Sequence, residues 1–144
     1  MSNEKLIEMK ELLKKTLGQL GCPIVDEEET TVFFNYQDKR FAIELGGQFI
    51  TIVYPNWGEV SVEDEDMMHL REAVNMANFH SGPEVLISAP GDDGKIRVHS
   101  KYPLFFHESL PALDEYLDVA FKLMLQTEKG VIYYFHEFKA GRKP

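Results

Sequence analysis

The stretch TVFFNYQDKRFAIELGGQFITIVY, residues 31–54, decides the fold of this chain. It contains three strand-like runs, Thr31–Tyr36, Phe41–Leu45 and Phe49–Tyr54, separated only by short polar or glycine-rich turns. In the middle run apolar residues alternate with small or charged ones, which is the period of a half-buried strand. Links this short permit only antiparallel pairing, because a parallel pair needs a crossover of about a dozen residues or more.

A helix precedes this stretch. Residues 5–20 repeat leucine and methionine at steps of three and four between charged side chains, which is the pattern of an amphipathic helix. We expect this helix to be capped by Ser2 or Asn3 and to end at Gly21, just before a proline.

A second helix and a hairpin follow. We expect the helix to open near Ser61, to carry the acidic run 63–66 in its first turn, and to end at His80. Negative charge is favoured there because the helix dipole and the unpaired amides are positive at that end. Residues 85–89 and 96–100, joined by a turn rich in glycine and aspartate, predict two further antiparallel strands.

A third helix is predicted near the C-terminus, with Ser109 as its cap and Pro111 in its first turn. The last apolar segment, 131–138, is open to two interpretations. Its β-branched and aromatic residues suit a strand, whereas its threefold apolar spacing suits a helix that resumes after a break at 128–130. We favour the helix.

The predicted order is therefore α-β-β-β-α-β-β-α, within one domain that covers residues 1–144. Five antiparallel strands with one apolar face, covered by helices on that face, indicate a two-layer α+β fold.

Charge and composition exclude several classes of partner. The chain has 24 acidic and 15 basic residues, and its formal net charge of −9 disfavours nucleic acids and anionic membranes. One cysteine cannot form an internal disulfide. No window approaches the roughly 20 apolar residues of a membrane-spanning helix, and the acidic start does not match a signal peptide. We expect a cytoplasmic protein.

Two parts of the chain carry a family resemblance. They are an opening helix with a Gly-Cys-Pro exit, and a middle helix that ends in an N-x-x-N pair before two strands joined by an acidic glycine turn. The residues are Leu20-Gly21-Cys22-Pro23, Val74-Asn75-Met76-Ala77-Asn78, Val85–Ser88, Asp92-Asp93-Gly94 and Ile96–His99. This pattern resembles the YbjN-like family of proposed bacterial sensory transduction regulators, over the chain up to about Leu125.

The resemblance implies a fold shared with type III secretion chaperones. It also implies a small acidic adaptor or chaperone-like domain in which no catalytic residues are established. The aromatic ending Tyr133–Phe138 departs from the family's common pattern.

No motif for catalysis, metal or cofactor binding is present. The five histidines and the single cysteine have no spacing that selects zinc, and the acidic runs 26–29 and 63–66 lack the layout of a calcium loop. No phosphate loop, nucleophile elbow or dinucleotide fingerprint occurs. We interpret Cys22 as a small buried residue, and we expect no enzyme, no metal and no cofactor.

Asn75 and Asn78 lie three residues apart on the second predicted helix. They are suited either to gripping a ligand or to fastening the helix end to the following loop, and we favour the second role.

The aromatic residues are the strongest functional lead. Apolar patches that remain outside a core usually mark an interface. The aromatic residues considered are Trp57, Tyr102, Phe105, Phe106, Tyr133, Tyr134, Phe135 and Phe138. From them we take as candidate protein-interaction residues Trp57, Tyr133, Tyr134, Phe135 and Phe138.

These observations predict a non-catalytic protein-binding module, an adaptor, regulator or chaperone-like domain, whose partner is another protein or a second copy in a homodimer. Such a domain would hold its partner against the sheet or along a strand edge. The alternative is a small-molecule sensor or enzyme with a pocket between sheet and helices, where Asn78, Arg97 and His99 would converge.

Overall fold

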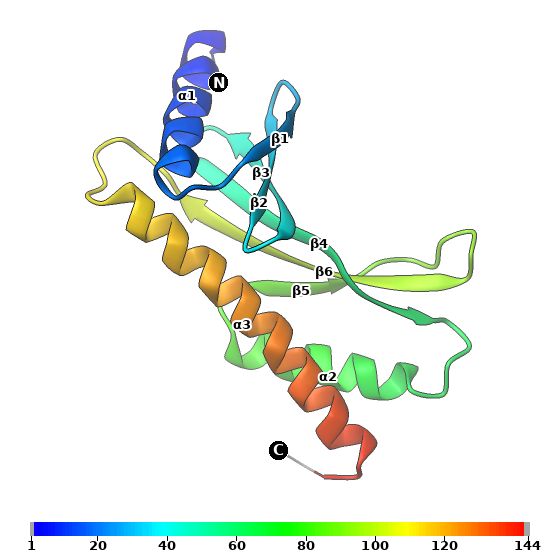
Figure 1. Ribbon diagram of the computed structural model, residues 1–144. Coiled ribbons are helices and arrows are strands. Elements are labelled where there is room, and N and C mark those ends of the chain that lie inside the picture. The colour runs from blue at the N-terminus through cyan, green and yellow to red at the C-terminus, as the bar shows by residue number, and fades with distance from the viewer. Residues whose placement is uncertain (1, 143–144) are drawn as a thin grey trace. The chain divides into compact units, whose positions relative to one another are not determined.

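The computed structural model describes residues 2–142, and it is an α+β protein with an antiparallel sheet. Within those residues it has three helices and six strands, one strand more than expected. In chain order these are α1 (Asn3–Gln19), β1 (Ile24–Glu27), β2 (Thr31–Tyr36), β3 (Lys39–Gly46), β4 (Phe49–Ser61), α2 (Met67–His80), β5 (Glu84–Ile87), β6 (Lys95–Phe105) and α3 (Leu113–Lys139) (Figure 1).

The strand order in the sheet is β1-β2-β3-β4-β6-β5. The three strand-like runs of residues 31–54 form the meander β2-β3-β4, with Val32 opposite Ile43 and Ile43 opposite Ile52. These three side chains are fully buried, so the three strands and their antiparallel pairing are confirmed, and their paired apolar residues face the core. The extra strand is β1, which pairs with β2.

The chain folds into two compact units. Unit 1 contains the described residues up to 54 together with 102–122, and unit 2 contains 55–101 and the described residues from 123. Strands β4 and β6 and helix α3 each run from one unit into the other.

Aromatic side chains fill the core of unit 1. Phe34 on β2 and Phe41 on β3 are fully buried, and the ring of Phe121 from α3 lies 5.2 Å from that of Phe34. The rings of Phe41 and Tyr54 stack with centroids 4.6 Å apart. Offset and tilted ring pairs of this kind add to the free energy that burial supplies.

A hydrogen bond between two side chains joins β2 of unit 1 to α3. The Tyr36 hydroxyl donates to Asp118 Oδ1 at 2.7 Å, and Lys122 Nζ lies 2.7 Å from Asp118 Oδ2. The hydrogen bonds from Lys122 and Tyr36 lower the pKa of Asp118 below its usual 3.8. Burial and the bond to Asp118 raise the pKa of Tyr36, so the phenol stays protonated.

Unit 2 has a separate core. Leu70, Ala73, Val74 and Ala77 of α2 belong to one buried cluster, to which α3 adds Val131. The strands complete this cluster with Val85, Ile96 and Val98.

Asn78 covers the outer edge of β5 in unit 2. Its Nδ2 donates to the Val85 carbonyl oxygen at 3.1 Å, and the Val85 N–H donates to its Oδ1 at 2.7 Å. This pair satisfies two backbone groups that would otherwise be open to another strand. The predicted fastening role is therefore confirmed for Asn78.

Helix α1 begins and ends as predicted. Ser2 is the N-cap, and its side chain accepts a hydrogen bond from the Lys5 N–H at 3.3 Å. Gly21 follows the helix with φ of 71°, a conformation that glycine adopts without strain.

The predicted ends of two strands were wrong. The run that begins at Phe49 does not end at Tyr54, where it was expected to end, because β4 continues to Ser61. Asn56 has a φ of 55°, and its N–H donates to Nδ1 of the His99 side chain at 2.9 Å. Asparagine tolerates this conformation, and a strand accepts proline where no ladder donor is needed. β6 likewise continues through Pro103 to Phe105.

The predicted start of α2 was also wrong. The helix begins at Met67, and the acidic run 63–66 precedes it. The Ser61 carbonyl accepts from the Asp64 N–H at 3.0 Å, and Asp64 Oδ1 accepts from the Asp66 N–H at 2.8 Å. These local bonds hold the acidic run in turns that compete with a helix.

Helix α3 starts later than predicted and has no break. Ser109 bonds to His107 instead of capping the helix, and Ala112, with φ of 51°, interrupts the helical path before Leu113. Residues 128–130 are helical, so the segment 131–138 is a helix, as favoured, but without the expected interruption.

We predict that Tyr36→Phe lowers the free energy of unfolding by roughly 1–2 kcal/mol, because it removes a hydrogen bond to an ionised carboxylate. Urea denaturation measures the change, with Tyr133→Phe, at an exposed ring, as the matched control.

The lowered pKa of Asp118 makes the stability of the protein depend on pH. The contribution of Asp118 to the free energy of unfolding is present above the usual pKa of 3.8 and is lost as pH falls through the lowered pKa of the folded state. Asp118→Asn should flatten this acid dependence; an unchanged profile would contradict the assignment.

We predict that Asn78→Ala destabilises the protein by roughly 1–3 kcal/mol, because it leaves two backbone groups of Val85 without their partner. Asn78→Asp keeps the acceptor and loses the donor, so its effect should be intermediate. Asn75→Ala, at an exposed position of the same helix, is the control. Hydrogen exchange at the Val85 amide measures the local effect, and equal exchange rates in the Asn78→Ala and Asn75→Ala variants would show that Asn78 does not protect this edge.

Candidate functional site

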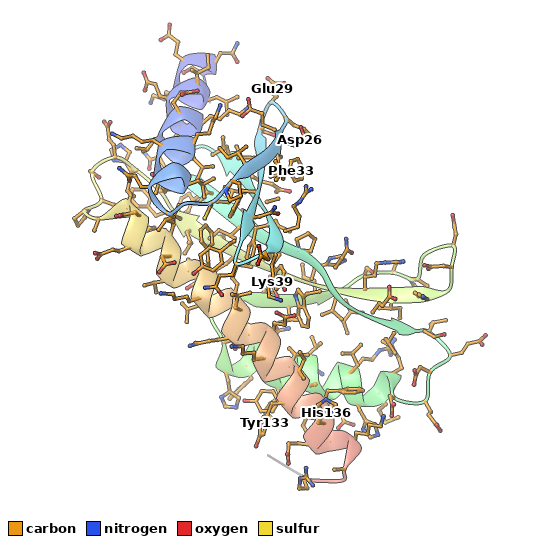
Figure 2. The ribbon with its side chains drawn as sticks, in the orientation of Figure 1. Asp26, Glu29, Phe33, Lys39, Tyr133 and His136 are labelled. Atoms are coloured by element: carbon orange, nitrogen blue, oxygen red, sulfur yellow. The ribbon has the colours of Figure 1, made fainter. Side chains whose placement is uncertain are left out.

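All five predicted interaction residues lie in unit 2, four of them on α3. Only one of the five is classed as exposed. Trp57, Tyr134, Phe135 and Phe138 are half-buried and pack against the core cluster of unit 2. Tyr133 is 54% exposed, and Figure 2 shows it projecting from α3.

Helical periodicity explains this division. Val131 lies three and four residues before Tyr134 and Phe135, and Phe138 lies three and four residues after Phe135 and Tyr134, so all four share the packed side of α3. Tyr133, one position from Tyr134, is turned by about 100° around the helix and faces outward.

Trp57 is fixed by a hydrogen bond. Its indole N–H donates to the hydroxyl of Ser100 at 3.0 Å, and Ser100 is fully buried. Burying that hydroxyl is tolerated because it has a partner. Trp57 therefore stands in a defined position at the surface of unit 2.

A groove of about 310 Å³ lies beside Trp57, and we call it the Trp57 groove. Its floor is apolar, and the charged residues of the described chain that line it are all acidic. The lining consists of Trp57, Gly58, Glu59, Val60, Asp64, Asp66, Leu70, Val98, Val131, Ile132 and Phe135. Two of the predicted interaction residues, Trp57 and Phe135, therefore line the same groove.

A second apolar area lies between α2 and the end of α3, and we call it the Phe79 surface. It is a shallow depression of about 480 Å³ lined by Glu72, Asn75, Met76, Phe79, His80 and Phe138. Phe79 is 84% exposed, the largest value among the exposed large hydrophobic residues of the described chain.

Phe79 was not among the residues predicted from the sequence, although a signal was present. The buried stripe of α2 runs through Leu70, Val74 and Ala77, and Phe79 falls off that stripe by two residues. A phenylalanine outside the apolar face of an amphipathic helix is expected to be exposed.

The residues of the alternative hypothesis are each bonded to a different group. Asn78 is held by Val85, and Arg97 pairs with Asp93 at 2.6 Å. The His99 ring accepts the Asn56 N–H, and burial, followed by the charge of Arg97, lowers its pKa. Each side chain therefore has its own structural partner.

Unit 1 contains a polar pocket of about 400 Å³ that the sequence analysis did not identify. Cys22, Tyr36, Asp118 and Lys122 are among its lining residues. Burial, with a smaller effect of Asp118, raises the pKa of Cys22, and the thiol is only 6% exposed. The interpretation of Cys22 as a small buried residue is confirmed.

The acidic run 26–29 forms part of β1 and the following turn, and Figure 2 shows Asp26 and Glu29 there. Glu27 pairs with Lys14 at 3.2 Å, and β1 is exposed throughout. Within residues 2–142, no group of three or more histidine, cysteine, aspartate or glutamate side chains is placed to hold a metal ion.

Among the described residues, none of the helices combines the length and the apolar character needed to cross a membrane.

Comparisons with known proteins bear on the fold alone. No protein-family model matches the chain, and no curated protein matches its sequence. The structure is similar to the crystal structure of YbjN from E. coli, which is described as a candidate transcription regulator, with a TM-score of 0.57 and 15% identity over 91% of both chains. The resemblance to YbjN that the sequence predicted is thereby shown at the level of the fold.

Proposed function

We propose that this protein is a non-catalytic protein-binding module, an adaptor, regulator or chaperone-like domain that holds its partner on the helices of unit 2. The proposal rests on one observation, which is that large apolar side chains on α2 and α3 are exposed. Phe79 and Met68 of α2 are 84% and 67% exposed, and Tyr133 of α3 is 54% exposed. Large apolar side chains that remain exposed outside a core are typical of interaction surfaces.

The strand edges are less suited to this role. The edge of β5 is covered by Asn78 at Val85. The edge strand β1 is short, irregular in register between Ile24 and Asp26, and acidic. Irregular register and charge discourage the addition of another strand. Contact through side chains on the helices therefore fits the molecule better than contact through a strand edge.

The ionisable groups of the polar pocket support a non-catalytic role. The pKa of Cys22 and that of Tyr36 are raised, and the pKa of Asp118 is lowered. Each shift moves the pKa of its group further from neutral pH, whereas a general acid or base works best with a pKa near the operating pH. The fold shared with YbjN, itself described as a regulator candidate, is compatible with this proposal.

A second candidate function is a small-molecule sensor, which the same polar pocket favours. Tyr36, Asp118 and Lys122 present a donor, an acceptor and a cation at one opening of about 400 Å³. A thermal-shift screen of metabolites separates the two functions. A ligand whose stabilisation is lost in the Lys122→Ala variant would favour the sensor.

We predict that Phe79→Ser combined with Tyr133→Ser reduces recovery of the native partner at least about tenfold, because buried aromatic anchors dominate interface energy. The measurement is affinity purification from the native host with quantitative mass spectrometry. Stability should change by no more than about 0.5 kcal/mol for each exposed position.

The matched control is Phe49→Ser, which removes a phenylalanine that is 57% exposed in unit 1. Solution mass measured for all variants tests self-association. Equal partner recovery and unchanged mass for the double variant and the parent would refute the proposed surface.

A further inference from the structure

The Trp57 groove combines two properties that select a partner. Its floor is apolar, built by Trp57, Leu70, Val98 and Phe135, and Ile132 at its lip is 47% exposed. Its volume of about 310 Å³ lies at the lower end of the range for binding clefts. A space of that size accommodates one or two apolar side chains.

The charged lining of the groove has one sign. Glu59, Asp64 and Asp66 line it, and none of the lysine or arginine residues that the structure describes does. Glu63 and Glu65 extend the same acidic run, both at exposed positions. The end of the groove formed by the run 63–66 is therefore strongly negative.

Bases at the periphery offset part of this charge. Lys95 and Arg97 lie 3.4 and 3.9 Å from the carboxylate of Glu59, and Lys139 lies 2.9 Å from Asp66. Arg97 has a nearer partner in Asp93 at 2.6 Å. The run 63–66 carries four carboxylates, and within residues 2–142 the ion pair that it makes is the one with Lys139, so negative charge remains in excess in this part of the described chain.

Lys139 shows that the acidic run 63–66 stabilises a positive charge next to it. The hydrogen bond to Asp66 and the charges of Asp66, Asp64 and Glu65 all raise its pKa. Three carboxylates of the acidic run therefore act together on one ammonium group. A basic residue brought in by a partner would experience the same attraction at neighbouring positions of the run.

We infer that the Trp57 groove binds a segment of another protein that presents one or two large apolar side chains flanked by lysine or arginine. This inference rests on the proposed function and names the chemistry of the partner. Apolar contacts with the floor supply affinity, and the acidic run supplies selection and faster association. The same charge disfavours nucleic acids and anionic membranes as occupants.

The single tryptophan of the chain makes the test direct, because Trp57 is part of the groove. The full-length protein is titrated with a synthetic peptide of leucines spaced three and four residues apart with lysines between them. We expect a saturable change in Trp57 emission. Affinity should fall at least about tenfold when glutamates replace the lysines, when serines replace the leucines, or when salt is raised to about 1 M, where screening extends over only ~3 Å.

Variants locate the binding site. Glu63→Gln, Asp64→Asn and Glu65→Gln, made together, should weaken binding of the lysine peptide by about tenfold, and Ile132→Ser should weaken it as well. The matched control is Asp26→Asn, Glu28→Gln and Glu29→Gln, which removes the same charge from exposed positions of unit 1. Equal losses in the two triple variants would overturn the inference, because net charge and not the groove would then be responsible.

Three other results would also overturn it. The first is equal binding of the glutamate and lysine peptides. The second is a change of emission with protein concentration alone, which would mean that a second copy fills the groove. The third is saturation of the same signal by n-hexylamine at the same concentration, which would mean that the groove takes a small organic cation. If partner recovery depends on Phe79 while the lysine peptide does not bind, the inference fails and the proposed function stands.

Discussion

The structure depends above all on the burial of one apolar stripe along α3. This helix has 27 residues, and its buried positions follow the helical period without interruption. In unit 1 the stripe places Leu117 and Phe121 in the core, where Phe121 contacts the rings of β2 and β3. In unit 2 it places Val131 among the residues of α2, β5 and β6. A single helix thus supplies apolar area to both cores, and burial of that area is the dominant favourable contribution to folding.

Polar side chains lie at the edges of the sheet, whereas the exposed aromatic side chains of unit 2 lie on its helices, and this division bears on function. The edge of β5 is closed by the Asn78 amide, and β1 carries acidic side chains. The exposed aromatic side chains of unit 2 stand instead on α2 and α3, at Phe79 and Tyr133. A protein organised in this way resists pairing of its strands with other chains, and it leaves side-chain surfaces as the means of contact.

The elements with strong local signals could be predicted, and those that depend on neighbours could not. Helix α1 has its cap at Ser2 and its stop at Gly21, and β2 ends where its β-branched and aromatic run ends. Strand β1 was missed because all four of its residues are exposed, so no alternation marks it, and it forms by pairing with β2. The continuation of β4 past Pro55 could not be predicted either. It depends on the side chain of His99, 43 residues further along the chain, which accepts the hydrogen bond from the Asn56 N–H.

The sequence by itself determined that aromatic residues gather near the C-terminus and that acids outnumber bases, because both follow from composition. It also determined that Phe79 stands off the apolar stripe of its helix, because helical period is a local property. Only the tertiary structure decided which aromatic side chains are packed and which are exposed, and that Trp57 and Phe135 share a groove with the acidic run. That outcome depends on contacts between residues far apart in the chain, which no local pattern contains.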